Sequence, residues 1–219
     1  MTSQPTITLN DIRAALALPD FDSHRAWEAM RLRPHLKRTG PLDGEKPRHA
    51  AVLVLIYPVD GVLTTLLMRR TPDPGVHSGQ IGFPGGSWEP GDPDYTATAL
   101  REACEEVGLC EPVTVLGHLT PVYIPPSRFL VMPTVATIPI HPVWKPNPDE
   151  VAELLELPLP HLLDANNKRE KDWELGGMVF RVPYYDVDGQ VVWGATALML
   201  SELEGRLRAV LASRDSAVT

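Results

Sequence analysis

A glycine-rich loop that runs directly into one well-marked helix is the feature that most constrains the fold of this chain. The loop, residues 71–94, is rich in Gly and Pro, and we expect it to contain no regular structure. The next segment, YTATALREACEEV at residues 95–107, has a helical pattern, with Asp92 as a suitable N-cap, Pro93 in the first turn and Gly108 at the end. Because loops this long inside a compact domain are usually functional, we expect the functional site to lie at this junction between loop and helix.

Strand and helix patterns on both sides of this junction predict an α+β fold. Residues 48–70 hold two β-rich runs split by Asp60-Gly61, a dipeptide that favours a hairpin turn. Further elements are expected in this order: strands at 113–123 and 129–140, a short helical or irregular crossing at 148–163, a hairpin at 173–194 turning at Asp188-Gly189, and an amphipathic helix at 196–211.

The length of 219 residues allows one domain or at most two. We expect an N-terminal helical extension at residues 1–47, a main domain at 48–212 and a C-terminal tail at 213–219. No run approaches the roughly 18 apolar residues of a membrane helix. The first residues also lack the basic and apolar regions of a secretory signal, so we expect a cytoplasmic protein without a membrane partner.

Charge and cysteine usage narrow the possible partners. A formal net charge of −8 argues against a general nucleic-acid binder, since such proteins need a basic surface, but it allows a small phosphorylated substrate. Cys104 and Cys110 are six residues apart and form no ligand-spaced pair, so we expect reduced thiols rather than a disulfide or zinc site.

Three glutamates share one face of the predicted helix. Glu102, Glu105 and Glu106 fall within about 100° of arc on a helix of 3.6 residues per turn. Neighbouring like charges destabilise a helix by a few tenths of a kcal/mol per pair, and a divalent cation would reverse that cost. Mg²⁺ prefers carboxylate oxygens shared with substrate phosphates, and Arg101 stands at the spacing that would orient Glu105.

The same glutamates are also compatible with an ordinary solvated helix face, which is common in proteins. The context favours a site, because Phe83-Pro84-Gly85-Gly86 precedes the helix and glycines let the backbone approach a ligand or metal closely.

The junction resembles the Nudix box, usually written as Gly, five residues, Glu, seven residues, and then Arg-Glu-apolar-any-Glu-Glu-any-Gly-apolar. Gly86 and residues 101–109, REACEEVGL, match this pattern. Asp92 replaces the usual Glu, and one extra residue separates it from Arg101. The resemblance implies an α/β/α sandwich around a mixed β-sheet. It also implies binding of Mg²⁺ or Mn²⁺ by Glu102, Glu105 and Glu106, with the Gly86 carbonyl nearby.

The segment upstream of the box is similar to a signature of the coenzyme A diphosphatase branch of that family. The matching positions that would contact substrate are Arg70, His77, Gln80, Gly85 and Gly86. Pro74 and Gly75 stand where that branch has Leu and Arg. Arg70 suits bidentate contact with phosphate, although it is also compatible with a surface charge at a strand end. His77 is equally compatible with a phosphate contact and with a structural hydrogen bond.

Glu150 is a second candidate for acid–base chemistry, outside the box. It lies in the Pro-rich segment NPDEV, where a carboxylate could serve as the general base, as could Glu102. The competing interpretation is an acid at the N-terminus of a helix over VAELLEL, favoured there by the helix dipole.

The resemblance therefore implies metal-dependent hydrolysis of the diphosphate bond of coenzyme A and its derivatives to 3′,5′-ADP and 4′-phosphopantetheine. Two alternatives stay open. One is hydrolysis of another nucleoside diphosphate derivative, such as ADP-ribose or a dinucleotide cofactor. The other is a non-catalytic nucleotide sensor, against which the intact set of three glutamates argues. The sequence leaves the oligomeric state and the number of metals open.

Overall fold

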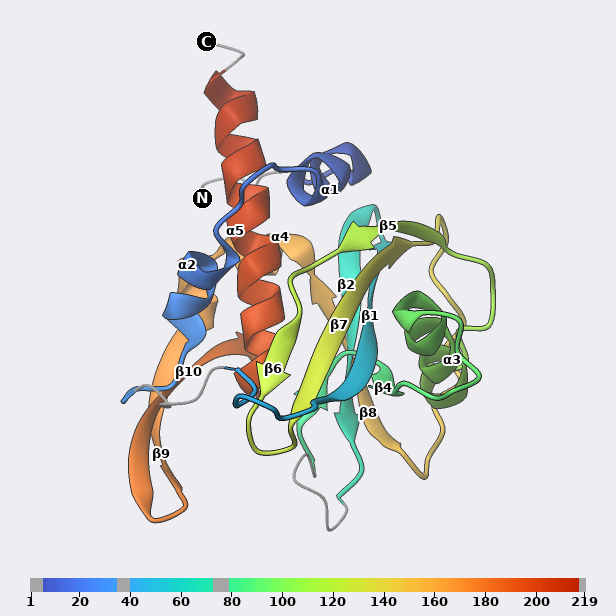
Figure 1. Ribbon diagram of the computed structural model, residues 1–219. Helices are drawn as coiled ribbons and strands as arrows, with labels where there is room; N and C mark the ends of the chain where they lie inside the picture. Colours follow the sequence, from blue (N-terminus) through green and yellow to red (C-terminus); the bar gives the residue numbers. More distant parts are fainter. Residues whose placement is uncertain (1–5, 35–39, 73–78, 217–219) are drawn as a thin grey trace.

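A mixed β-sheet lies between helices on its two faces. The computed structural model describes residues 6–34, 40–72 and 79–216, and it places α3 against one face of the sheet and α5 with α1 and α2 against the other (Figure 1). The predicted α+β class and the α/β/α sandwich around a mixed sheet are confirmed.

The central strands of the large sheet follow the order β3-β2-β1-β7-β5, with β4 paired to β1, β6 to β7 and β8 to β2. The pairing of β1 with β7 is parallel and the other pairings are antiparallel. The bounds are β1 Arg48–Val59, β2 Val62–Arg70, β3 Ile81–Gly82, β4 Gly85–Ser87, β5 Thr114–His118, β6 Val122–Ile124, β7 Phe129–Thr137 and β8 Val151–Pro158.

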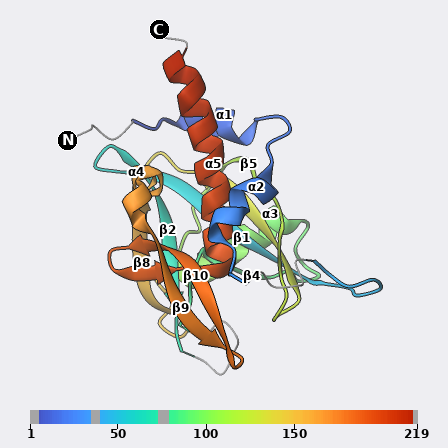
Figure 2. The same ribbon diagram turned by 90° about the vertical axis from the view of Figure 1, so that its left-hand side faces the viewer.

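A second, three-stranded antiparallel sheet lies beside α5, in the order β11-β10-β9 (Figure 2). Its strands are β9 Lys168–Leu175, β10 Met178–Val187 and β11 Gln190–Val192. The α-helices are α1 Leu9–Leu16, α2 Ser23–Trp27, α3 Tyr95–Val107, α4 Leu159–Leu163 and α5 Gly194–Ser216, and the 3₁₀ turns are η1 Glu28–Met30 and η2 Ala165–Asn167.

Strand β1 separates two apolar cores, because its side chains alternate between the faces of the sheet. Ala51, Leu53 and Leu55 belong to the core under α3, whereas Val54 and Ile56 belong to the core under α5. Each face is therefore shielded from water by a helical layer, which accounts for the almost unbroken apolar run in this strand.

Both predicted hairpin turns are confirmed. Val59 pairs with Val62 across Asp60-Gly61, and Val187 pairs with Gln190 across Asp188-Gly189. The structure adds a hairpin that the sequence did not predict, in which β9 and β10 turn at residues 176–177.

Two expectations were wrong. Residues 148–163 are not a helical or irregular crossing, because half of the segment pairs with β2 as strand β8 and only its end forms the short helix α4. The loop at 71–94 is not free of regular structure either, since β3 and β4 lie inside it. In both cases backbone pairing with a neighbouring strand, which local patterns do not reveal, decides the conformation.

The N-terminal helices pack on the C-terminal helix rather than forming a separate unit. α1 and α2 both contact α5, and Arg206 of α5 donates to the carbonyl oxygen of Ala15 at 3.2 Å. α5 extends to Ser216, so the expected boundary of the tail at residue 213 falls inside a helix. Among the described residues, no helix is long and apolar enough to cross a membrane.

Candidate active site

Helix α3 carries the predicted carboxylates and has a defined cap at each end. Its N-cap is Asp94, whose side chain accepts from the Ala97 amide, so the expectation of Asp92 as N-cap was wrong. At the other end Gly108 adopts the left-handed conformation with φ 76°, which ends the helix as predicted.

The guanidinium group of Arg101 connects the helix to the loop that precedes it. Its Nε and Nη2 atoms each donate to a carboxylate oxygen of Asp92 at 3.0 Å, and Nη2 also donates to the carbonyl of Ser87 at 3.0 Å. Its Nη1 donates to Glu102 at 3.0 Å and to Glu105 at 3.1 Å. The five N–H donors of the group thus meet five acceptors, and the expected contact of Arg101 with Glu105 is present.

Asp92 is not the N-cap of α3, but its carboxylate has a structural role as a hydrogen-bond acceptor in the loop before the helix. Besides the two bonds from Arg101, its carboxylate accepts from the Glu89 amide at 3.1 Å and from the Thr98 hydroxyl at 2.9 Å. The Arg101 guanidinium holds the pKa of the Asp92 carboxyl at about 2, well below its ordinary value. Despite the extra residue in the loop, Asp92 therefore stays ionised and fixes the orientation of Arg101.

Glu106 is the buried member of the glutamate set. Its side chain is 1% exposed, and it accepts from the Gly85 amide at 2.7 Å and from Arg70 at 2.9 Å. Burial raises the pKa of Glu106 to about 7, although the Gly85 amide and the Arg70 charge act in the opposite direction. The helix and the glycine strand β4 are joined directly through this carboxylate.

Glu102 lies against the backbone of Gly86. A Cβ atom at Gly86 would stand 2.5 Å from the Glu102 carboxyl carbon, so a side chain there would displace the carboxyl group. Burial also raises the pKa of Glu102, with Arg101 opposing the shift and the charges of Glu105 and Glu150 adding to it. The stricter requirement for glycine is at Gly85, where φ is +155° and a Cβ atom would stand 2.3 Å from the backbone oxygen of Ala51.

The carboxylate set is chemically suited to a hard divalent cation. Glu102 and Glu106 are poorly solvated carboxyl groups with raised pKa values, and Glu105 is 54% exposed and held by one ion pair to Arg101 within the described residues. Carboxylate oxygens are the donors that Mg²⁺ and Mn²⁺ prefer. In the part of the chain that the structure describes, no three potential ligands converge on one point, and Arg101 and Arg70 hold the glutamates instead.

Glu150 approaches the helix from a different part of the chain. The Asn147 amide donates to the Glu106 carbonyl at 2.8 Å, and the Asn147 side chain donates to the Glu150 carboxylate at 3.3 Å. Glu150 is also close enough to Glu102 for its negative charge to raise the pKa of the Glu102 carboxyl. The competing interpretation of Glu150 as an acid at a helix N-terminus was wrong, because the following residues form strand β8.

A cavity of about 1070 Å³ lies beside this cluster and meets it at β4. Four predicted substrate-binding residues line it, namely Arg70, Gln80, Gly85 and Gly86; the fifth, His77, lies outside the described residues. The volume is at the upper end of the roughly 300–1,000 Å³ typical of small-molecule sites. The cavity therefore has room for a ligand much longer than the diphosphate that the glutamates would face.

Much of the cavity wall comes from segments that the sequence did not connect with the site. Trp27 and Met30 reach it from the N-terminal segment, Phe180 from β10 and Met199 from α5, and Arg48 stands at the start of β1. No local pattern marks these residues as ligand contacts, since apolar residues at such positions usually belong to the core. Only the packing of the N-terminal segment and β10 around α5 brings them together.

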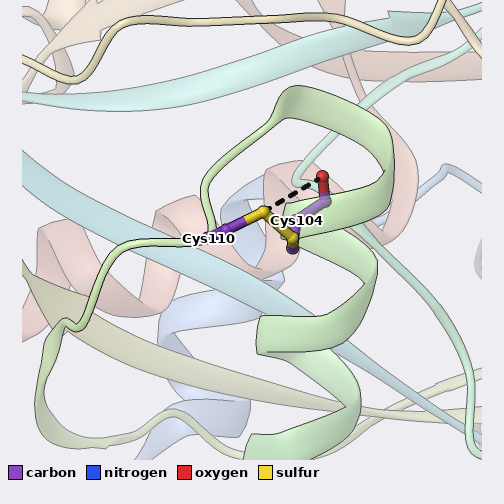
Figure 3. Close-up of a disulfide and its surroundings, with 2 residues drawn as sticks. All are labelled: Cys104 and Cys110. Carbon is purple, nitrogen blue, oxygen red and sulfur yellow. Dashed lines mark hydrogen bonds between the residues drawn. A yellow bond between two sulfur atoms is a disulfide. The ribbon is translucent and has the colours of Figure 1, made fainter.

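Cys104 and Cys110 form a disulfide at the end of α3, so the expectation of reduced thiols was wrong (Figure 3). In a continuous helix, residues six apart would be about 9 Å apart along the axis. Here the turn at Gly108 reverses the chain and brings the two Cα atoms to 4.7 Å. The bond closes a short loop that contains Glu105 and Glu106.

Comparisons with known proteins agree with this geometry. The family model for the NUDIX domain matches residues 47–175. A protein named uncharacterized Nudix hydrolase NudL, from Photorhabdus laumondii, is 39% identical over 157 residues, covering 71% of this chain and 83% of its own. The mitochondrial coenzyme A diphosphatase NUDT8 of Homo sapiens is 40% identical over 159 residues, covering 70% of this chain and 67% of its own.

A solved structure also has a similar fold. The crystal structure of RenU, a Nudix hydrolase from M. smegmatis, superposes with a TM-score of 0.50 at 20% sequence identity, covering 84% of this chain and 94% of that one. At this identity the likeness concerns the fold alone.

The Arg101–Asp92 contact yields a first testable prediction. Asp92→Asn should lower catalytic activity on a nucleoside diphosphate substrate by about 10-fold or more, because partners that orient metal-binding side chains typically contribute that much. The measurement is kcat/KM at saturating Mg²⁺, with circular dichroism to verify folding. Asp43→Asn, which makes the same change at an exposed residue, is the control. Wild-type activity in Asp92→Asn would contradict the orienting role.

Proposed function

The chain belongs to the Nudix hydrolase family, and we propose that it hydrolyses the diphosphate bond of coenzyme A and its derivatives to 3′,5′-ADP and 4′-phosphopantetheine. The observation that carries this proposal is the position of the large cavity, whose lining includes Gly85 and Arg70, both bonded to Glu106. A human relative at 40% identity is named for coenzyme A diphosphatase activity, which supports the same substrate class.

Glu102, Glu105 and Glu106 would hold Mg²⁺ or Mn²⁺, with the backbone carbonyl of Gly86 as a further oxygen ligand. A divalent cation bound there supplies positive charge next to the diphosphate and lowers the pKa of a water molecule. Glu105 is the glutamate best able to reorient, because its side chain is largely exposed.

The remaining residues position the reacting groups. Arg101, fixed by Asp92, keeps Glu102 and Glu105 on the same side of the helix. Arg70 lies between Glu106 and the cavity, so its other guanidinium N–H groups can donate to the diphosphate, while Gln80 lines the same end. These contacts hold the substrate so that the bond to be cleaved faces the glutamates.

The general base is proposed to be Glu150, with Glu102 as the alternative. Glu150 is tied to the end of α3 through Asn147, close enough to influence the pKa of Glu102. A carboxylate in this place, outside the proposed ligand set, can accept the proton of the attacking water.

Two other functions stay possible alternatives within this family. ADP-ribose or a dinucleotide cofactor carries the same diphosphate and would meet the same glutamates. A nucleotide sensor without catalysis is disfavoured by the complete set of Glu102, Glu105 and Glu106. A small-molecule ligand is common to all three functions. The cytoplasmic location and the absence of nucleic-acid partners stay predictions, and the Cys104–Cys110 bond is of a kind more typical of oxidising compartments.

Replacement of the exposed glutamate tests the metal site. Glu105→Gln should fold normally and lose activity by about 100-fold or more, because it removes a charged oxygen ligand and preserves side-chain volume. Excess chelator should abolish wild-type activity, and added Mg²⁺ should restore it. Glu111→Gln, at an exposed acid just after the helix, is the matched control. Near wild-type turnover in Glu105→Gln at saturating Mg²⁺ would remove this residue from the metal site.

The general base has its own test. Glu150→Gln should lower kcat by roughly 100-fold and leave metal affinity largely unchanged, because the change removes a proton acceptor rather than a ligand. Metal affinity is measured by titration calorimetry and kcat over a range of pH. An unchanged kcat and an unchanged pH–rate profile would transfer the role to Glu102.

The substrate is tested by competition. Coenzyme A, 3′-dephospho-coenzyme A and ADP-ribose are mixed at equal concentration, and their consumption is followed by mass spectrometry. Coenzyme A should be consumed more than about 10-fold faster than the other two, because a site built for its phosphate discriminates against ligands without it. Equal consumption, or preference for ADP-ribose, would reject coenzyme A while leaving the hydrolase assignment in place.

A further inference from the structure

Arg48 is a cation in the cavity wall with no ion-pair partner among the residues that the structure describes. It lines the same cavity as Gly85 and Gly86, and its guanidinium carbon lies 4.1 Å from the centre of the Phe129 ring. Stacking on an aromatic ring restricts the guanidinium group while leaving its N–H donors available. The side chain of Arg48 is exposed, so its unpaired guanidinium group is accessible to an anion that enters the cavity.

The position of Arg48 separates it from the glutamates. Every second residue at the start of β1 lines the cavity, namely Arg48, Ala50 and Val52. Ala51, between the last two, pairs with Gly86 of β4. Arg48 and Ala51 are three residue steps apart along the strand, a distance of about 10 Å. Phe129 lies on β7, which pairs with β1 along the edge opposite β4, so Arg48 leans away from the glycine strand.

Basic residues outside the cavity lining, such as Arg69 and Lys168, already have carboxylate partners. Arg69 is bonded to Glu153 at 3.0 Å, and Lys168 is bonded to Glu204 at 2.6 Å. Arg31 also lines the cavity, but its guanidinium is bonded to Glu28 at 2.7 Å.

Arg128, the neighbour of Phe129, is 65% exposed and faces Glu45 at 3.9 Å. Arg70 at the near end of the cavity is bonded to Glu106. Among the described Lys and Arg residues that line the cavity, Arg48 is therefore the one without a carboxylate partner.

We propose that Arg48 is the subsite for a second phosphate of the substrate, a phosphate monoester distinct from the diphosphate that is cleaved. This proposal rests on the proposed function and adds a residue that determines specificity. It selects nucleotides that carry both a diphosphate and a terminal phosphate monoester, and it assigns that recognition to a residue outside the glycine-rich loop and the glutamate helix. Coenzyme A has this combination, whereas its 3′-dephospho form and ADP-ribose do not.

The test compares two nucleotides that differ by one phosphate, without requiring catalysis. Binding of 3′,5′-ADP and of 5′-AMP is measured by titration calorimetry for the wild type, Arg48→Gln, Arg48→Lys and a control. The control is Arg13→Gln, which makes the same change of charge at an exposed residue outside the cavity.

The wild type should bind 3′,5′-ADP at least about 10-fold more tightly than 5′-AMP, because charge-assisted hydrogen bonds are the stronger class. Arg48→Gln should remove this preference and leave 5′-AMP binding unchanged, whereas Arg48→Lys should retain part of it. Arg13→Gln should match the wild type. The preference should also shrink as salt rises, since the site is open to solvent.

Kinetics give a second readout. Arg48→Gln should raise KM for coenzyme A by about 10-fold with little change in kcat, and it should leave the kinetics of 3′-dephospho-coenzyme A unaltered, as expected when a ground-state contact is lost. A purely structural role for Arg48 would lower activity on both substrates equally.

The outcomes separate this proposal from the function on which it rests. If the wild type hydrolyses coenzyme A and its 3′-dephospho form equally well, or binds the two nucleotides equally, the Arg48 subsite is overturned and the hydrolase assignment stands. If no diphosphate is hydrolysed but Arg48→Gln selectively weakens 3′,5′-ADP binding, the subsite stands and the proposed reaction is overturned.

Discussion

The candidate site depends on how closely α3 approaches the short strand β4. The absence of a side chain at Gly86 lets the Glu102 carboxylate rest on the backbone, and the Gly85 amide donates to the Glu106 carboxylate at 2.7 Å. A side chain at Gly86 would displace the Glu102 carboxyl group, and a Cβ atom at Gly85 would stand only 2.3 Å from the backbone oxygen of Ala51. The acidic face of α3 is thus held beside the cavity by contacts with the backbone of β4.

Like charges gathered on one helix face require compensation, and two arginines provide it here. Arg101 donates hydrogen bonds to Glu102, Glu105 and Asp92. Arg70, at the end of β2, donates a hydrogen bond to Glu106. The burial that raises the pKa values of Glu102 and Glu106 would also strengthen their attraction to a cation, because charges interact more strongly where water is excluded. Arg48 differs from both arginines, because it lies farther along the cavity and has no carboxylate partner among the described residues.

Much of the chemistry could be predicted from sequence because it is carried by local spacing. The glutamates share a face because a helix repeats every 3.6 residues, and the turns at Asp60-Gly61 and Asp188-Gly189 follow from residues that accept positive φ. Strand β8 could not be predicted in this way. Its partner β2 is about 90 residues away in sequence, and pairing with a distant strand overrode the helical pattern of VAELLEL.

The sequence by itself determined the identity of the carboxylate set, the helix that presents it and the glycines that let it meet the backbone, since these depend on neighbours within a few residues. Only the tertiary structure decided which other side chains and which cavity lie next to these carboxylates. The disulfide depends on a chain reversal at Gly108, and the Asp92–Arg101 pair depends on the path of a loop. The cavity depends on segments as far apart as Trp27 and Met199, which pack together because each has apolar surface to bury.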